Sequence, residues 1–288
     1  MPVVLHSLSR GEFLMISETI LKKVYKPRKD WSRKYDFGSL LIIGGSKLYH
    51  GSPALAAMTA LRTGVDLVTV AAPERAANLI AAVSPDLITY PLRGDRITNL
   101  HLRVLLQLAE KKTAVVIGGG MGREHDTLHA ILDFLRINKL PAVIDADAIH
   151  AVAKNKSAIK NNCILTPHFG EFYVLTGIKA AEDLKSVVQL EAKKINATIL
   201  LKGHIDTISN GAKTEENKTG NVFMTKGGTG DTLAGICGSL LAQGIEPFDA
   251  ACAAAYINGK AGDLAAKEKK QSLLATDLIA KLPEVFSE

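Results

Sequence analysis

The sequence predicts an α/β fold with a central, mostly parallel β-sheet and helices on both of its faces. Short, uninterrupted apolar runs recur along the chain, as expected of strands that are buried on both sides. Segments with helical periodicity alternate with these runs, which is typical of parallel sheets. No linker, low-complexity tract or internal repeat interrupts the alternation. We therefore expect one domain over residues 35–288, preceded by an N-terminal helical extension over residues 1–34.

Each element follows from its own local pattern. The segment FLMISETILKKVY (13–25) has apolar residues at three- and four-residue spacing, which predicts a helix. SPALAAMTALRTG (52–64) opens near a proline and ends at a glycine, as helices often do. The last third of the chain is expected to be mostly helical. In chain order, the other expected elements are strands at 39–45, 66–73, 113–120, 141–148, 162–167 and 197–203, and helices at 74–83, 99–110 and 127–136.

The composition excludes several classes of protein. Apolar residues make up 47% of the 288 positions, but no apolar run approaches the roughly 18 residues of a membrane span, and the N-terminus lacks a long apolar segment. Cys163, Cys237 and Cys252 lie far apart in apolar surroundings, which predicts free thiols in the core and a reducing compartment. We expect a cytoplasmic protein that does not act at a membrane.

The charge distribution favours a small-molecule ligand. The net charge is +6, and the lysines and arginines are scattered. The densest cluster, KKVYKPRKDWSRK (22–34), is interpreted as a solvated face rather than a nucleic-acid site. A mildly basic protein suits an anionic substrate. The sequence therefore predicts no nucleic-acid partner.

Polar and glycine-rich segments follow the predicted strands. Ligands of parallel α/β sheets bind beyond the carboxyl ends of the strands, so these segments should lie together. Their co-location predicts an enzyme. The segments are GGSKLYHGSP (44–53), GGGMGRE (118–124), DADAI (145–149), TPHFGE (166–171), KGHID (202–206) and TKGGTGDTLAGICGSLLAQG (225–244).

Several familiar phosphate and metal motifs are incomplete. GGSK (44–47) lacks the spacing of a P-loop, and GGGMG (118–122) lacks the third glycine of a dinucleotide fingerprint. His125 and His129 are four residues apart on a predicted helix, but no third ligand accompanies them. We interpret these two histidines as a solvated helix face rather than a zinc site.

The segment GGTGDTLAG (227–235) indicates phosphoryl transfer. Its glycines suit backbone amides that point at one anion at the start of a helix. A carboxylate beside them, Asp231, makes chemical sense if the phosphoryl group moves to a hydroxyl whose proton Asp231 accepts. A mere helix cap would not need three preceding glycines. We expect the helix dipole to lower the pKa of Asp231, which would make it a weak base.

Together these motifs resemble the ADP- or ATP-dependent NAD(P)H-hydrate dehydratases, a group of ribokinase-like proteins. GGTGDTLAG is shared among ribokinase-like enzymes, whereas TPHFGE combined with GSPALAA (51–57) is more specific. The resemblance spans about residues 35–285. It implies a ribokinase-like fold and a hydro-lyase that repairs nucleotides. The implied reaction phosphorylates the ring hydroxyl of the (6S)-hydrate of NADH or NADPH and then eliminates phosphate.

The resemblance also implies roles for individual residues. Asp231 would be the base and would also contact the hydrate. The implied anion hole is Gly228, Thr229 and Gly230, the implied hydrate contacts are Ala54, Gly120 and His168, and the implied nucleotide-binding residues are Lys202, Gly203, His204, Ile205, Asp206 and Gly230. Mg²⁺ is the implied cofactor, ADP or ATP the phosphate donor, and a homo-oligomer, specifically a tetramer, the implied assembly.

Other parts of the chain leave alternatives open. Asp145 and Asp147 either serve magnesium, directly or through its ligands, or cap a helix. Lys218 and Asn221 are expected near the nucleotide loop. The alanine-rich segment DAACAAAYINGKAG (249–262) is expected to pack against a second subunit. The sequence does not choose between ADP and ATP, or between the hydrates of NADH and NADPH.

The chain departs from the family pattern at two loops. Gly119 replaces a proline in GGGMG, and Phe169 replaces a proline in TPHFGE, which affects loop rigidity rather than activity. Some relatives carry a preceding epimerase domain, for which the residues before position 35 are too few, so we expect a dehydratase alone. The alternative is a kinase of a hydroxyethylthiazole or hydroxymethylpyrimidine type. A third hypothesis, a nucleotide sensor without turnover, conflicts with the carboxylate of Asp231.

Overall fold

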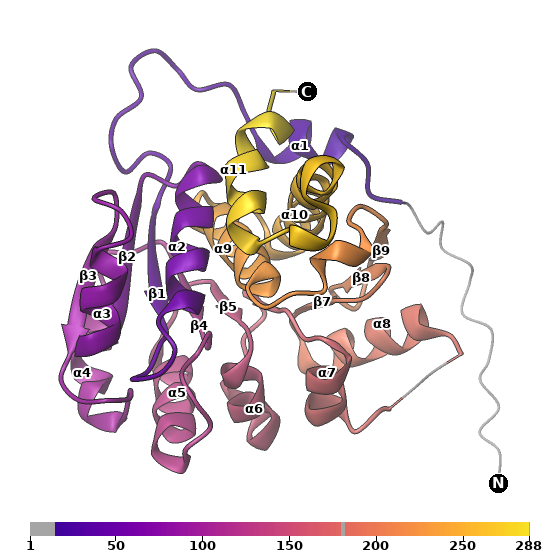
Figure 1. Cartoon of the computed structure of the whole chain (residues 1–288). Coiled ribbons are helices and arrows are strands. Elements are labelled where there is room, and N and C mark those ends of the chain that lie inside the picture. Colours follow the sequence, from indigo (N-terminus) through magenta and orange to yellow (C-terminus); the bar gives the residue numbers. More distant parts are fainter. Residues whose placement is uncertain (1–14, 180–181, 288) are drawn as a thin grey trace, which may run out of the picture.

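A single twisted sheet forms the centre of the protein (Figure 1). In the computed structural model, which describes residues 15–179 and 182–287, nine strands pair in the order β3-β2-β1-β4-β5-β6-β7-β8-β9. The strands from β1 to β7 are parallel to their neighbours, whereas β8 and β9 add an antiparallel edge. The strands are β1 (Ser39–Ile43), β2 (Leu67–Pro73), β3 (Ile88–Leu92), β4 (Ala114–Ile117), β5 (Ala142–Ile144), β6 (Cys163–Leu165), β7 (Thr198–Leu201), β8 (Asp206–Ser209) and β9 (Thr214–Asn217).

Helices cover both faces of this sheet. In β1, Leu40 and Ile42 pack on one face and Leu41 and Ile43 on the other, because successive side chains of a strand alternate. The first face carries α2 (Gly51–Arg62), α3 (Glu74–Ala81), α9 (Thr229–Ala242), α10 (Pro247–Lys269) and α11 (Ala275–Val285), and the second carries α4 (Leu102–Ala109), α5 (His125–Ile137), α6 (Asp147–Lys154), α7 (Phe169–Thr176) and α8 (Leu184–Ile195). The predicted α/β class, with a mostly parallel sheet and helices on both faces, is confirmed.

The order of the strands reverses beside β1. The chain moves from β1 outward to β2 and β3, and then returns to place β4 on the other side of β1. Ligands of open α/β sheets bind at such a reversal, beyond the carboxyl ends of the two strands. There the amide of Gly45 donates to the carbonyl of Gly119 over 2.8 Å, which joins the loops that follow β1 and β4.

The predicted helical extension is much shorter than expected. Residues 1–14 lie outside the described part of the chain, and α1 spans only Thr19–Val24. Residues 25–38 form an irregular loop at the top of Figure 1. Pro27 disfavours helical geometry at the residue before it, and the polar run that follows has no apolar face to pack. The prediction of a helix through residue 34 is therefore wrong.

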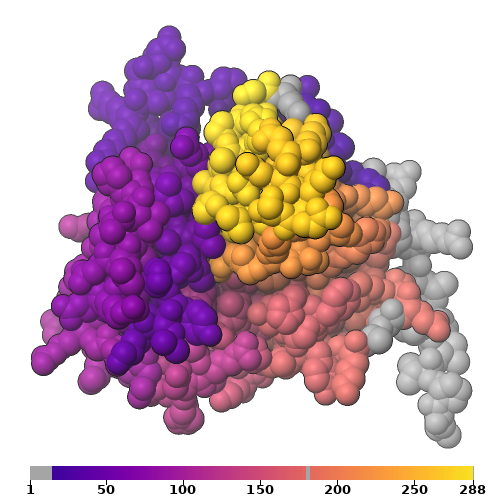
Figure 2. Space-filling view, viewed as in Figure 1, coloured from indigo at the N-terminus to yellow at the C-terminus, as the bar shows by residue number. Residues whose placement is uncertain are grey.

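The alanine-rich segment differs from its expected role. Helix α10 packs against α9 and α11 of the same subunit. The side chains of Ala250, Ala253 and Ala254 have no exposed surface. Figure 2 shows the yellow C-terminal residues standing directly above the orange residues that follow β7. Small side chains let these helices approach closely within one subunit. The expectation that this segment packs against a second subunit is therefore wrong.

Several further features of the described residues bear on the expectations from the sequence. Cys163, Cys237 and Cys252 are buried and free. In the described part of the chain, no helix is long and apolar enough to cross a membrane. His125 and His129 are exposed on α5, as expected of a solvated helix face. The strands β3, β8 and β9 were not predicted, since β3 is largely exposed and β9 reads TEEN.

Candidate active site

The glycine-rich loop before α9 takes a conformation that only glycine adopts readily. Gly228 is the residue that precedes the first turn of α9, and its φ is +100°. A Cβ atom there would lie 2.7 Å from Cδ1 of Leu55 and 2.8 Å from Cβ of Ala275. The hydroxyl of Thr229 donates to the carbonyl of Met224 over 2.9 Å, which fixes the loop from inside. The amide of Thr229 donates to the carbonyl of Lys226 over 3.5 Å. Gly230 and Asp231 follow in the first turn of α9, where amides have no partner within the helix.

Asp231 lies in the first turn of α9 and faces the reversal point of the sheet. Its Oδ1 accepts a hydrogen bond from the hydroxyl of Ser52, at the start of α2. These two side chains line a small cavity together with Gly44, Gly119 and Asp145. The cavity thus brings together the ends of β1, β4 and β5 and the start of α9, as expected for a substrate site in an α/β sheet.

Burial makes Asp231 a stronger base than the sequence suggested. Burial raises the pKa of Asp231 from 3.8 to about 6, and the nearby carboxylate of Asp145 adds to this rise. The hydroxyl of Ser52 and the ammonium group of Lys202 oppose it. From the sequence, the helix dipole was expected to lower this pKa. That expectation is wrong, because the loss of hydration around a buried carboxylate outweighs the field of the helix.

Lys202 joins the aspartate site to the segment that follows β7. Its Nζ lies 3.1 Å from Oδ1 of Asp145 and 3.8 Å from Oε2 of Glu171, and a Cβ atom on Gly230 would lie 3.4 Å from it. Burial alone would lower the pKa of Lys202, but the two carboxylates hold it above its ordinary value. Lys202 therefore carries a full positive charge beside the anion-binding loop.

The segment TPHFGE forms a tight turn at the start of α7. Nδ1 of His168 accepts from the amides of Gly170 (2.9 Å) and Glu171 (3.2 Å), and Glu171 in return accepts from the amide of His168 (2.8 Å). The side chain of His168 is 59% exposed, and its Nε2 lies 3.5 Å from Oε1 of Glu171. His168 thus caps the helix with Nδ1, while most of its ring stays exposed to solvent.

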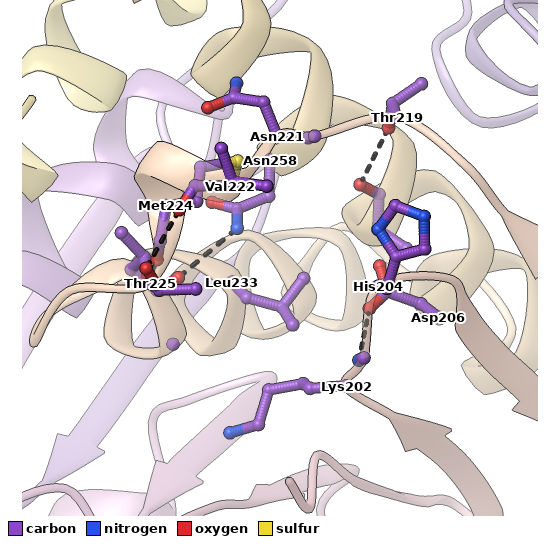
Figure 3. A pocket seen from close by; sticks show the side chains of 16 residues that line it. Lys202, His204, Asp206, Thr219, Asn221, Val222, Met224, Thr225, Leu233 and Asn258 are labelled. Atoms are coloured by element: carbon purple, nitrogen blue, oxygen red, sulfur yellow. Dashed lines mark hydrogen bonds between the residues drawn. The ribbon is translucent and has the colours of Figure 1, made fainter. Parts of the chain in front are cut away.

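A cavity of about 320 Å³ lies on the other side of Lys202. The segment after β7 supplies Lys202, Gly203, His204 and Asp206, and the start of α9 supplies Thr229, Gly230 and Leu233. Figure 3 shows Leu233 between Lys202 on one side and Asn221 and Val222 on the other. Helix α10 closes the cavity with Ala255, Asn258 and Gly259, and the loop at 219–225 forms the remaining wall.

Buried polar side chains hold these walls in place. Burial raises the pKa of Asp206, while Nδ2 of Asn217 and the amide of Gly203 donate to its carboxylate over 3.1 Å each. Nδ2 of Asn258 donates to the carbonyl of Thr229 over 3.2 Å, a bond drawn in Figure 3. Leu233 gives the cavity apolar surface and Lys202 gives it a positive charge, which suits a nucleoside with phosphates.

The remaining candidate residues lie at different places. Ala54 is buried in α2 two residues after Ser52, and Gly120 has a φ of +66° and packs against Tyr49. Ile205 is half-buried in the segment after β7, and Lys218 is exposed beside the 219–225 loop. Neither Ile205 nor Lys218 is among the described residues that line the 320 Å³ cavity.

The two aspartates of DADAI have separate surroundings. Oδ1 of Asp145 accepts from the hydroxyl of Thr166 (2.7 Å) and from Lys202, so this carboxylate belongs to the site. Asp147 accepts from the amide of Gly122 (2.9 Å) and from Nε of Arg123 (2.8 Å), so it fixes the GGGMG loop. Within the described residues, no three His, Cys, Asp or Glu side chains could hold a metal ion by themselves.

Sequence reasoning missed several residues of these cavities, among them Ser52, Asn258 and Gly259. Ser52 was quoted only as part of GSPALAA, because nothing local links it to an aspartate 179 residues away. Asn258 and Gly259 lie in the alanine-rich helix, whose composition suggested only packing. The available signal was an asparagine, buried in the structure, that follows the alanine-rich run of α10.

A family model described as NAD(P)H-hydrate dehydratase matches residues 40–284. The chain belongs to this family. An ADP-dependent (S)-NAD(P)H-hydrate dehydratase of Cenarchaeum symbiosum is 38% identical over 94% of this chain and 96% of its own length. A bifunctional NAD(P)H-hydrate repair enzyme of Pyrobaculum aerophilum is 42% identical over 90% of this chain. The chain spans only 52% of that enzyme, about half of its length.

Solved structures agree with this assignment to the dehydratase family. An ADP/ATP-dependent NAD(P)H-hydrate dehydratase of Bacillus subtilis, co-crystallised with ATP/Mg²⁺, superposes with a TM-score of 0.80 at 25% identity, covering 96% of this chain and 98% of the other. A ribokinase-like protein of Enterococcus faecalis reaches a TM-score of 0.86 at 26% identity, over 98% of each chain. The implied ribokinase-like fold is confirmed. A hydroxyethylthiazole kinase of Pyrococcus horikoshii, at 19% identity and a TM-score of 0.62, shares the fold alone.

Proposed function

We propose that this protein removes water from the hydrate of NADH or NADPH at the expense of ADP or ATP. The observation that carries the proposal is the position of Asp231. Its carboxylate contacts Ser52 and lines the small cavity at the sheet reversal. The residue before it, Gly230, lines the 320 Å³ cavity. A base between a hydroxyl site and a phosphate site is the arrangement that phosphoryl transfer needs.

The nucleotide fits the larger cavity in one orientation. Its base would lie against Leu233, Val222 and Met224, which give this part of the wall apolar surface. Its phosphates would lie at the other end, where Lys202 and the first amides of α9 provide positive charge and hydrogen-bond donors. The terminal phosphoryl group then points toward Asp231. His204 and Asp206 would border the sugar and phosphates, in agreement with the roles that the resemblance implies for this segment.

Asp231 would act on the ring hydroxyl of the hydrate. With a pKa raised to about 6, it is largely ionised at pH 7 and still accepts a proton more readily than an ordinary aspartate. The hydroxyl oxygen forms a bond to the terminal phosphorus as its proton passes to Asp231, and the bond between that phosphorus and the leaving nucleotide breaks. Gly228, Thr229 and Gly230 would place their amides around the phosphoryl oxygens during this step.

Elimination completes the reaction. The lone pair of the ring nitrogen forms a double bond to the adjacent carbon, the carbon–oxygen bond breaks, and phosphate leaves with its electron pair. A proton is then lost from the neighbouring ring carbon, which restores the dihydronicotinamide. Phosphate is a far better leaving group than hydroxide, and this difference explains why dehydration consumes a nucleotide. Ala54, Gly120 and His168 are proposed to surround the hydrate, as the resemblance implies.

Mg²⁺ is part of the proposal as the partner of the phosphates. It usually keeps several waters and binds one or two carboxylates together with substrate phosphate oxygens. Asp145 and Glu171 are carboxylates at the phosphate end and fit this chemistry, since Lys202 holds them next to Gly230. When bound, Mg²⁺ would neutralise charge on the phosphates. The absence of a three-ligand cluster in the described residues agrees with an ion held mainly by the nucleotide.

The test is to mix the protein with hydrated NADH, Mg²⁺ and either ADP or ATP. The near-ultraviolet absorbance of the dihydronicotinamide should return with at least one nucleotide and not without it. Phosphate release should match the NADH formed, mole for mole. A phosphorylated hydrate that accumulates instead would mean a kinase. No reaction with either nucleotide would overturn the proposal. Repeating the assay with hydrated NADPH would rank the two substrates.

A variant pair makes the test specific to the site. Asp231→Asn should lower turnover by about 10² to 10⁴, the usual contribution of a general base. Asp30→Asn, the same change at an exposed position in the loop before β1, should have no effect. Equal activity of both variants would remove Asp231 from the mechanism. The proposed homo-oligomer, a tetramer, and the cytoplasmic location stay predictions, to be checked by light scattering and by cell fractionation.

A further inference from the structure

Ser52 is the side chain that directly contacts the carboxylate of Asp231. Its hydroxyl donates to Oδ1 of Asp231, and both residues line the small cavity at the sheet reversal. Gly119 leaves room for this contact, since a Cβ atom there would lie 2.1 Å from Oγ of Ser52. The hydrogen bond therefore depends on three separate elements: the start of α2, the loop after β4 and the first turn of α9.

We propose that Ser52 is a positioning residue that orients the Asp231 carboxylate toward the substrate hydroxyl and keeps it ionised. The inference rests on the proposed function and deepens it. With Oδ1 occupied by Ser52, Oδ2 is the oxygen left to take the proton of the substrate. A hydroxyl that donates to a carboxylate favours the charged form, so Ser52 also extends the activity of the base to lower pH.

The charges around Asp231 make this contribution necessary. Asp145, which follows β5, is a second carboxylate near it and disfavours its ionised form. Lys202, which follows β7, opposes that effect, but its ammonium group is shared with Asp145 and with Glu171 on α7. Ser52 on α2 is the neutral donor of the group. Burial raises the pKa of Asp231 most strongly. Among the groups that shift this pKa, Ser52 and Lys202 are the two that lower it.

The experiment compares the pH dependence of kcat/KM for the wild-type protein and for Ser52→Ala. Loss of the donor should move the acidic limb upward by about one pH unit, since a hydrogen bond to a charged group is worth about that much. Activity should therefore fall most near pH 6 and least near pH 8. Ser52→Thr, which keeps a hydroxyl, should restore the wild-type limb. Thr59→Val removes another hydroxyl of α2, one that donates to the carbonyl of Leu55 over 2.6 Å, and should leave the limb unchanged.

A second measurement does not depend on turnover. Carbon-13 NMR of the carboxyl groups, with the Asp231 signal identified by its absence in Asp231→Asn, gives the pKa of this residue directly. The pKa should rise in Ser52→Ala. Identical titration curves in wild type and Ser52→Ala would overturn the inference. A wild-type protein without turnover would overturn the proposed function instead, and the NMR titration would still decide the role of Ser52.

Discussion

Nζ of Lys202 lies 3.1 Å from Oδ1 of Asp145, in an ion pair that joins the ends of β7 and β5. The side chain of Lys202 is 21% exposed and that of Asp145 only 5%, so water screens this pair poorly. Glu171 shares the same ammonium group. One cation therefore balances two buried carboxylates at the phosphate end of the site, and its removal should affect stability as well as nucleotide binding.

We predict that Lys202→Met destabilises the protein by about 3–5 kcal/mol, because removal of one partner leaves buried charge unpaired. Urea denaturation would measure this loss. Lys47→Met is the matched control, since Lys47 pairs with Asp95 at 2.9 Å but both side chains are more than 60% exposed. That variant should lose less than about 1 kcal/mol. Equal losses for the two variants would show that the Lys202 pair is no better shielded than a surface pair.

We predict that activity declines as the pH falls through about 6. Asp231 must be ionised to accept a proton, and burial raises its pKa to about 6. The rate should therefore follow a single ionisation on the acidic side, with half of the maximal kcat/KM near pH 6. A midpoint near pH 4, the range of an ordinary aspartate, would mean that the carboxylate is better solvated than the structure indicates.

We predict that Asp231→Asn is more stable than the wild-type protein at neutral pH. A carboxylate whose pKa is raised from 3.8 to about 6 binds its proton more tightly in the folded state, so its contribution to stability is lost as the pH rises through this window. The cost reaches about 3 kcal/mol above pH 7, and asparagine avoids it. The stability difference should grow by about 1 kcal/mol between pH 5 and pH 7. A difference that does not change with pH would contradict this account.

Local signals in the sequence sufficed for much of the fold and part of the site. The apolar runs identified β1, β2 and β4 to β7, and the glycines before Asp231 identified the anion-binding loop, because each signal lies within about ten residues. The pairing of Ser52 with Asp231 could not be predicted, since 179 residues separate them. The pKa of Asp231 was misjudged for the same reason. Desolvation comes from elements that are far apart in the sequence and pack around the carboxylate. The helix dipole, in contrast, follows from the start of α9, which the local sequence predicts.

We predict that Gly119→Ala impairs turnover more than stability. Its Cβ atom would lie 2.1 Å from Oγ of Ser52 and 3.4 Å from Oδ1 of Asp231, so Ser52 must move away from the carboxylate. Overpacking of this kind costs about 1–3 kcal/mol, whereas kcat should fall at least about tenfold because the base loses its orientation. Gly51→Ala is the control, since a Cβ atom on Gly51 would have no neighbouring atom within 4 Å. A similar kcat for both variants would contradict the prediction.

The last prediction concerns the wall of the larger cavity. A Cβ atom on Gly259 of α10 would lie 2.2 Å from Oγ1 of Thr219 and 2.6 Å from its carbonyl oxygen. Both residues line the cavity, so Gly259→Ala must push the loop at 219–225 away from α10. If the cavity binds ADP or ATP, the KM for the nucleotide should rise about tenfold, equivalent to about 1.4 kcal/mol. The KM for the hydrate should change little, because Asp231 and Ser52 lie on the other side of Lys202.

Gly238→Ala separates this effect from general overpacking. Its Cβ atom would lie 2.3 Å from Cγ2 of Val116, where α9 meets the sheet, away from the cavity. This variant should lose stability without a change in the KM for the nucleotide. Calorimetric titration with ADP would check both variants without turnover. Weaker ADP binding in Gly259→Ala alone would locate the nucleotide at α10. Equal binding in both variants would place it elsewhere, because a shift of the 219–225 loop cannot leave a nucleotide bound against that loop unaffected.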